Sequence, residues 1–180
     1  KAISLYPSQN SMYDREIAAD GLDVTYLHKK KGFDIGVVKE LRKAIQQYNP
    51  DVIHTHLYAL KYLLLTGEIK NRKVFHTIHN QPDKDVGKLD VLINKYCFRK
   101  SKVIPVTLQD ELANEVNNYY GVKNTRVIKN GIPLQEYSTK NNELYNELNL
   151  EKDTFVIGHI GRFSWQKNHD FIINIFEKIQ

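Results

Sequence analysis

Apolar positions along the first 130 residues alternate between short runs typical of strands and longer periodic stretches typical of helices. Residues 36–48 carry valine, leucine and isoleucine at the spacing of one helix face, and Asn49-Pro50 ends that stretch. The predicted strands are 1–6, 23–28, 51–56, 73–78, 103–106 and 125–129. The predicted helices are 36–48, 59–70, 90–99 and 107–120. Strands separated by helices of this length predict β-α-β units and a doubly wound parallel α/β sheet of the Rossmann-like kind.

Local signals mark both ends of the last of these helices. Thr107-Leu108-Gln109-Asp110 resembles a capping box, with Thr107 as the N-cap. Gly121 stands where a left-handed terminating residue is expected. The sequence therefore predicts a helix that begins after Thr107 and ends at Tyr120.

The character of the chain changes after Pro133. Residues 134–153 are rich in Asn, Glu and Lys and are expected to form an interdomain linker with one short helix. Residues 154–160 then predict a strand, and Asn168 is placed to cap a helix with an apolar face. One β-α unit cannot bury its own apolar faces, so we expect residues 1–133 to form one domain and 154–180 to begin a second.

Composition and charge exclude several classes of protein. The chain is 41% hydrophobic and 26% charged, which is ordinary for a soluble globular protein, and it lacks an apolar run near the ~18 residues of a membrane helix. Cys97 is the only cysteine, which excludes an internal disulfide and predicts a small buried side chain in a cytoplasmic protein. The net charge of +5 favours anionic substrates or peripheral contact with an anionic membrane. The basic clusters, among them Lys29-Lys30-Lys31, are expected to be solvated, and no nucleic-acid-reading motif accompanies them.

The segment between the predicted strand and helix of the second domain carries the strongest chemical signal. Gly161 and Arg162 follow the strand, and Lys167 stands directly before the helix. A glycine lets the backbone approach a ligand closely, and a helix N-terminus favours an anion. The guanidinium fork of Arg162 and the mobile charge of Lys167 suit a diphosphate. Two exposed basic residues in an ordinary loop are the alternative.

Four stretches together resemble retaining GT-B glycosyltransferases of the group 1, or family 4, type. Gly158–His169 resembles the loop that opens the C-terminal domain of these enzymes, with Gly-Arg followed by Lys-Asn. Pro50–His56 is similar to their Pro-Asp-Ile-Val-His-x-His strand, and Thr77–Asn80 to their Thr-x-His strand end. Val127–Ile132 is similar to their Val-Ile-x-Asn-Gly-Val element. The matches keep the order and spacing of the family over nearly the whole chain.

The resemblance implies an enzyme that moves a sugar from a nucleotide-diphosphate donor to a glycan or lipid-linked acceptor in cell-surface polysaccharide synthesis. Arg162, Lys167 and Gly161 match the positions that bind the diphosphate of the donor. His79 matches the histidine that lies near the transferred sugar and orients it. Such an enzyme needs no metal or other cofactor and works in the cytoplasm or at the inner face of the membrane.

Two features of the family are missing from residues 1–180. The family opens with a strand and a glycine-rich loop, whereas Lys1 falls at what resembles the second strand. The family also carries a Glu-x7-Glu segment for the nucleoside and sugar, which lies beyond the first helix of its second domain. The resemblance therefore implies that residues 1–180 form a fragment without turnover of its own.

Two other classes of function stay open on the residues alone. A non-catalytic α/β module that binds a sugar or nucleotide would keep the loop with Arg162 and Lys167. A metal-dependent hydrolase would use the histidines at the predicted strand ends, which are His54, His56, His76 and His79. The acidic residue of a His-x-His-x-Asp motif is absent after His56, because Leu57 and Tyr58 follow, so a scaffold role for His54 and His56 is the simpler interpretation.

Overall fold

A computed structural model describes residues 1–70, 72–131, 142–151 and 154–179. The chain divides into two compact units, Lys1–Ile132 and Pro133–Gln180.

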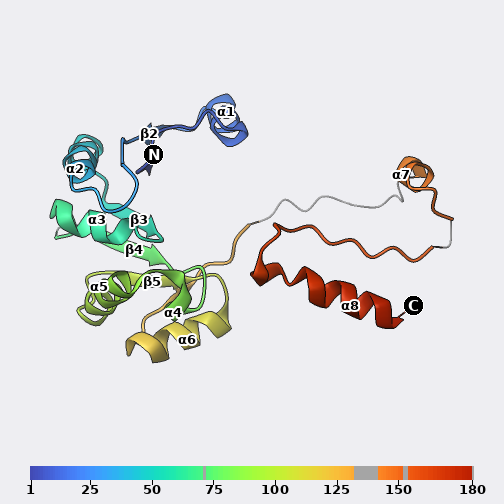
Figure 1. The fold of residues 1–180 in the computed structure, drawn as a ribbon. Coiled ribbons are helices and arrows are strands. Elements are labelled where there is room, and N and C mark those ends of the chain that lie inside the picture. Colours follow the sequence, from blue (N-terminus) through green and yellow to red (C-terminus); the bar gives the residue numbers. More distant parts are fainter. Residues whose placement is uncertain (71, 132–141, 152–153, 180) are drawn as a thin grey trace. The chain divides into compact units, whose positions relative to one another are not determined.

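The first unit is built on parallel strands (Figure 1). Two strands form a small sheet, β1 (Ala2–Ser4) and β2 (Val24–Tyr26). Four strands form a second sheet in the order β3 (Val52–His56), β4 (Lys73–Thr77), β5 (Ile104–Thr107) and β6 (Arg126–Val127). Every pair of neighbouring strands is parallel, which confirms the α/β, Rossmann-like class predicted from the alternation of elements.

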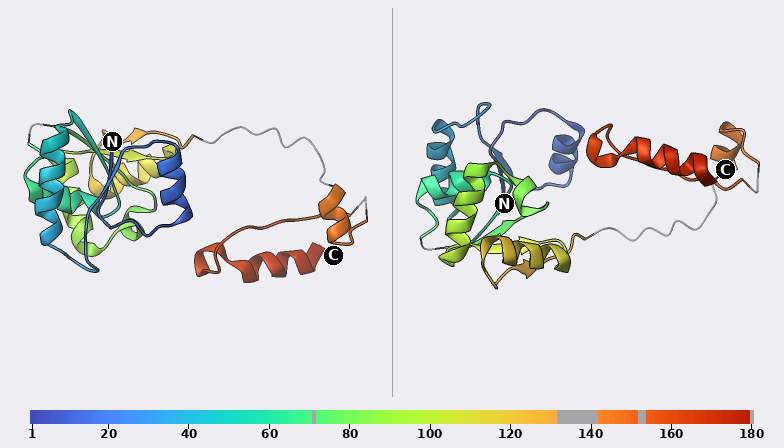
Figure 2. Two further views of the ribbon diagram at one scale, coloured as in Figure 1. Left: turned by 90° about the horizontal axis from the view of Figure 1, so that it is seen from above. Right: turned by 60° about the horizontal axis from the view of Figure 1, so that its bottom comes forward.

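Helices connect and cover these strands. They are α1 (Met12–Ala19), α2 (Gly36–Tyr48), α3 (Ala59–Thr66), α4 (Pro82–Asp85), α5 (Lys88–Arg99) and α6 (Asp110–Tyr120). The helices α2, α3, α5 and α6 pack against one another in sequence order beside the sheet (Figures 1 and 2). Their apolar faces and the strands bury one continuous core, in which Tyr62, Phe98 and Tyr120 are the largest buried side chains.

A groove of about 590 Å³ separates the two sheets and is lined by β1 on one side and β3 on the other. The strand order is therefore β2, β1, groove, β3, β4, β5, β6, and the direction of winding reverses at the groove. Lys73 donates its backbone N–H to the carbonyl of Asp51 at 3.2 Å. Backbone N–H and C=O groups of successive residues point to opposite sides of a strand. Those of Val52 and His54 therefore point away from β4, toward the groove. Ligands of doubly wound sheets bind at such a reversal, beside the carboxyl ends of the strands.

The boundaries of α6 confirm one sequence signal and overturn another. Gly121 ends the helix with φ of 69°, as predicted, and its N–H donates to the carbonyl of Asn117. The capping box at Thr107 is wrong. Thr107 is the last residue of β5, its hydroxyl donates to the carbonyl of Gln109, and the helix begins only at Asp110. Pairing of Thr107 with Val127 of β6 holds it in the sheet, where it cannot serve as a cap.

The remaining elements differ from the sequence prediction at their ends. Helix α3 ends at Thr66 and not at residue 70, because Gly67 adopts a left-handed conformation with φ of 76°. The helix α1 was not predicted at all. It is held by a capping box between Ser11 and Asp14 and buries no residue, so its sequence lacks the apolar stripe that marks a helix.

The second unit contains helices but no strand ladder among its described residues. They are α7 (Asn142–Glu147), a 3₁₀ turn (Trp165–Lys167) and α8 (His169–Ile179). The strand predicted over residues 154–160 is extended chain without a partner, and Phe155 and Ile160 are largely exposed. A strand needs a neighbour to satisfy its backbone, and the described part of this unit supplies none.

Two further predictions from composition can be compared with the structure. Cys97 is buried in α5, as predicted, and burial raises the pKa of its thiol. Within the part of the chain that the structure describes, no helix is long and apolar enough to span a membrane.

The left-handed conformation of Gly121 predicts a loss of stability on substitution. An added Cβ raises the energy of this conformation by about 1–2 kcal/mol, and at position 121 it would also lie 2.8 Å from Nη2 of Arg99. We expect Gly121→Ala to lower the free energy of unfolding of residues 1–180 by about that amount in urea denaturation. Gly131→Ala is the matched control, because nothing lies within 4 Å of its Cβ position and its φ is not positive. Equal stability of the two variants would contradict the prediction.

Candidate functional site

The carboxyl ends of β3 and β4 bring three histidines together at the edge of the groove. The parallel register pairs His56, the last residue of β3, with Thr77, the last of β4. His79 follows two residues later. His54 and His56 share one face of β3 because side chains alternate along a strand. Both residues line the groove.

The three imidazole rings are in direct contact. A hydrogen bond of 2.9 Å joins Nδ1 of His56 to Nε2 of His79, and the two rings stack with centroids 5.2 Å apart. The ring of His54 lies 4.6 Å from that of His56, and its Nε2 is 2.7 Å from the hydroxyl of Thr77. Burial lowers the pKa of His54 and of His56, and the neighbouring rings add to the effect by mutual repulsion. His54 and His56 are therefore held in their neutral form, in which each ring can donate and accept a hydrogen bond.

His76 does not belong to this cluster. It pairs in register with Thr55, and therefore lies on the opposite face of the sheet from His54 and His56. There it is fully buried, with its Nδ1 2.9 Å from the hydroxyl of Thr55 and its ring near Phe98 of α5. The four strand-end histidines thus do not converge. Among the described residues, no group of three or more His, Cys, Asp or Glu side chains is arranged to hold a metal ion.

Asp85, at the end of α4, fixes the turn that carries His79. Its Oδ1 accepts the backbone N–H groups of His79 and Asn80, each at 3.0 Å. Burial raises the pKa of this carboxyl group, although the two N–H donors act in the opposite direction. Sequence reasoning missed Asp85, since only the three-dimensional turn reveals what its carboxylate binds.

A second polar cluster surrounds Lys29 on the same side of the sheet, after the ends of β1, β2 and β3. The side chain is only 5% exposed, which corrects the interpretation of Lys29 as a solvated residue. Its ammonium donates to the hydroxyl of Tyr6 and to the carbonyls of Lys30 and Gly32, and it lies over the rings of Tyr6 and Tyr58. Burial acts to lower the pKa of Lys29, but hydrogen bonding to tyrosine raises it overall, so this lysine is charged. Its role is to hold the loop after β2 beside the groove.

The loop of the second unit brings two of its three predicted site residues into contact. A Cβ on Gly161 would lie 3.2 Å from Cγ of Lys167, so the lysine stem packs directly on the glycine backbone. Arg162 is exposed, and its carbonyl lies 3.0 Å from Nε2 of His169, the first residue of α8. Asn168 adopts a left-handed conformation with φ of 45° before the helix begins. The loop thus presents both basic side chains to solvent, beside the N-terminus of α8.

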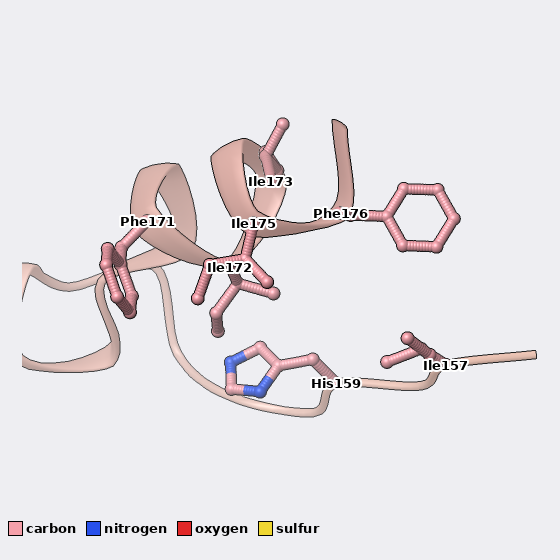
Figure 3. Close-up of a pocket in the computed structure, with 7 residues that line it drawn as sticks. All are labelled: Ile157, His159, Phe171, Ile172, Ile173, Ile175 and Phe176. Atoms are coloured by element: carbon pink, nitrogen blue, oxygen red, sulfur yellow. The ribbon is translucent and has the colours of Figure 1, made fainter. Parts of the chain in front are cut away.

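A cavity of about 340 Å³ in the same unit has a different character. It lies between the extended chain at residues 157–159 and one face of α8 (Figure 3). Its lining residues are Ile157, His159, Phe171, Ile172, Ile173, Ile175 and Phe176. The lining is apolar apart from the ring of His159, which points toward the helix. This surface is suited to packing and not to binding a phosphate.

Comparison with known proteins identifies the class of protein that this fold and site belong to. Residues 5–136 match the model of Glycosyltransferase Family 4, and the chain belongs to that family. An uncharacterized glycosyltransferase of Methanocaldococcus jannaschii is 25% identical over 156 residues, which cover 78% of this chain and 38% of that protein. The chain thus spans well under half the length of this relative.

Burial of His76 predicts a specific loss of stability in acid. Burial, with repulsion from the other histidines, lowers its pKa from 6.5 to about 3. The folded state therefore binds fewer protons than the unfolded state, so the contribution of His76 is complete above pH 6.5 and falls as the pH drops toward 3. At about pH 4.5 we expect a loss of about 2–3 kcal/mol relative to pH 7.

The comparison variant is His76→Gln, which keeps polar atoms but does not titrate. Urea denaturation at about pH 4.5 and 7 should show a smaller loss in this variant than in the parent chain. The same loss in both proteins would show that His76 does not cause the acid sensitivity.

Proposed function

We propose that this protein transfers a sugar from a nucleotide-diphosphate donor to an acceptor hydroxyl group. Membership of a glycosyltransferase family supports the reaction class. The structural observation that most supports the proposal is the pair of His56 and His79. Both rings are exposed at the carboxyl ends of β3 and β4, beside the groove at which the direction of winding reverses. Hydrogen-bonding groups at such a position are suited to hold the hydroxyl groups of a sugar.

In this proposal the loop Gly161–Lys167 binds the diphosphate of the donor. The exposed guanidinium of Arg162 can donate two parallel hydrogen bonds to phosphate oxygens, and Lys167 adds a mobile positive charge. Close packing of the lysine stem on Gly161 restricts where that charge can lie. As the bond between the sugar and the diphosphate breaks, negative charge develops on the leaving group, and these two cations stabilise it. A retaining reaction without a bound metal ion is the form of the mechanism that we propose.

His79 is proposed to orient the transferred sugar. Its ring is exposed and contacts His56, which lines the groove, and its backbone N–H donates to Asp85. A ring that is already hydrogen bonded to His56 needs little reorganisation to bind a substrate hydroxyl, which favours the transition state.

The acceptor is proposed to bind on the first unit, beside the groove between β1 and β3. A glycan or a lipid-linked sugar would fit a role in cell-surface polysaccharide synthesis. The net charge of +5 supports peripheral contact with an anionic membrane on the cytoplasmic side.

Arg162→Ala tests the donor site. A hydrogen bond to a charged group contributes about 1.5–3 kcal/mol to the free energy of binding. Its loss should therefore weaken binding of the donor nucleotide diphosphate roughly tenfold to a hundredfold. Calorimetric titration of the complete gene product with a panel of nucleoside diphosphates measures this change. Lys178→Ala, which removes an exposed charge from the last turn of α8, is the control and should leave affinity unchanged. Unchanged affinity in Arg162→Ala would remove this residue from the donor site.

His79→Ala tests the orienting role. We expect turnover by the complete gene product to fall on the order of a hundredfold, with little change in donor affinity, because a group that acts in the transition state affects kcat. His28→Ala is the matched control, since His28 is exposed and pairs with Glu40 away from the cluster. Equal turnover in His79→Ala and the parent would exclude the role.

A further inference from the structure

His56 and His79 form a contact with defined chemistry. Their Nδ1 and Nε2 atoms are 2.9 Å apart, and the rings stack at an interplanar angle of 29°. Two imidazole nitrogens at this distance are hydrogen bonded when one carries a proton and the other offers a lone pair. The pair therefore holds one bridging proton. It can be neutral or singly charged, and a second charge would break the bond.

This geometry decides which atom of His79 remains available. Nε2 is engaged by His56, so Nδ1 is the ring nitrogen that is left for a ligand. If His56 donates, neutral His79 carries its own proton on Nδ1 and offers a donor there. If His56 accepts, His79 offers a lone pair on Nδ1. In both cases the state of His56 determines what His79 presents.

The surroundings of the pair hold His56 in its neutral form. The ring of His54, on the same strand, lies 4.6 Å from the ring of His56. The buried His76 on β4 would repel a positive charge on His56. Burial comes first among the causes that lower the pKa of His56, followed by repulsion from His54 and from His79. The carboxylate of Asp85 on α4 faces the backbone of His79 and Asn80.

We propose that His56 is a positioning residue, which fixes the tautomer and ring orientation of His79 and leaves Nδ1 of His79 to bind the ligand. The identity of that ligand as the reacting sugar rests on the proposed function. The coupling of the two tautomers itself follows from the contact between the rings, because whichever ring donates, the other must accept, and it holds in the free protein.

The test is the nitrogen chemical shifts of the histidine rings, measured by NMR in residues 1–180 at neutral pH. We expect His79 to be a single tautomer in the parent chain and a mixture of both in His56→Phe. His56→Asn keeps a hydrogen-bond partner for Nε2 of His79, so its His79 shifts should lie closer to those of the parent chain than the shifts of His56→Phe do. Unchanged His79 shifts in His56→Phe would overturn the proposal.

A second measurement needs no substitution. We expect a scalar coupling across the hydrogen bond between Nδ1 of His56 and Nε2 of His79 in the NMR spectrum of the parent chain. Absence of this coupling would overturn the proposal even if His56→Phe failed to fold.

Kinetics of the complete gene product separate this inference from the proposed function. His56→Phe should lower kcat at least tenfold with unchanged donor KM, and His56→Asn should recover most of it. A normal kcat in His56→Phe would overturn the positioning role. Absence of sugar transfer in the parent protein, with the NMR result intact, would reject the proposed function and leave the tautomer assignment standing.

Discussion

The parallel pairing of β3 with β4 is the interaction on which the candidate site depends. Five residues of β3 pair in register with five of β4, from Val52 with Lys73 to His56 with Thr77. This register brings His79 to His56, and it sends His76 to the other face of the sheet. A shift by one residue would exchange these faces and bury the wrong histidine. The buried core beneath the sheet therefore fixes the arrangement of the site.

Burial and mutual repulsion give the histidine cluster its chemical character. Desolvation lowers the pKa of His54 and of His56, and each protonated ring would repel the others. A neutral His56 ring can both donate and accept a hydrogen bond, and it stacks on His79 with their ring nitrogens 2.9 Å apart. Asp85 orders the turn by accepting the backbone N–H groups of His79 and Asn80.

The two units contribute different chemistry to the proposed reaction. The first offers the hydrogen-bonding rings of His56 and His79 at a reversal of the sheet, where hydroxyl groups can be oriented. The second offers the exposed cations Arg162 and Lys167 beside a helix N-terminus, where a diphosphate can be stabilised.

The sequence by itself determined the fold class and most elements, because apolar periodicity and glycine positions are local signals. Helix α2 has the predicted bounds, and Gly121 ends α6 as predicted. Only the tertiary structure decided which side chains meet. The pairing of His56 with His79, the carboxylate of Asp85 on the turn and the burial of Lys29 join residues that are distant in the chain or unmarked by any local pattern. The strand predicted over 154–160 was wrong for the same reason, since a strand exists only where a neighbour completes its hydrogen bonds.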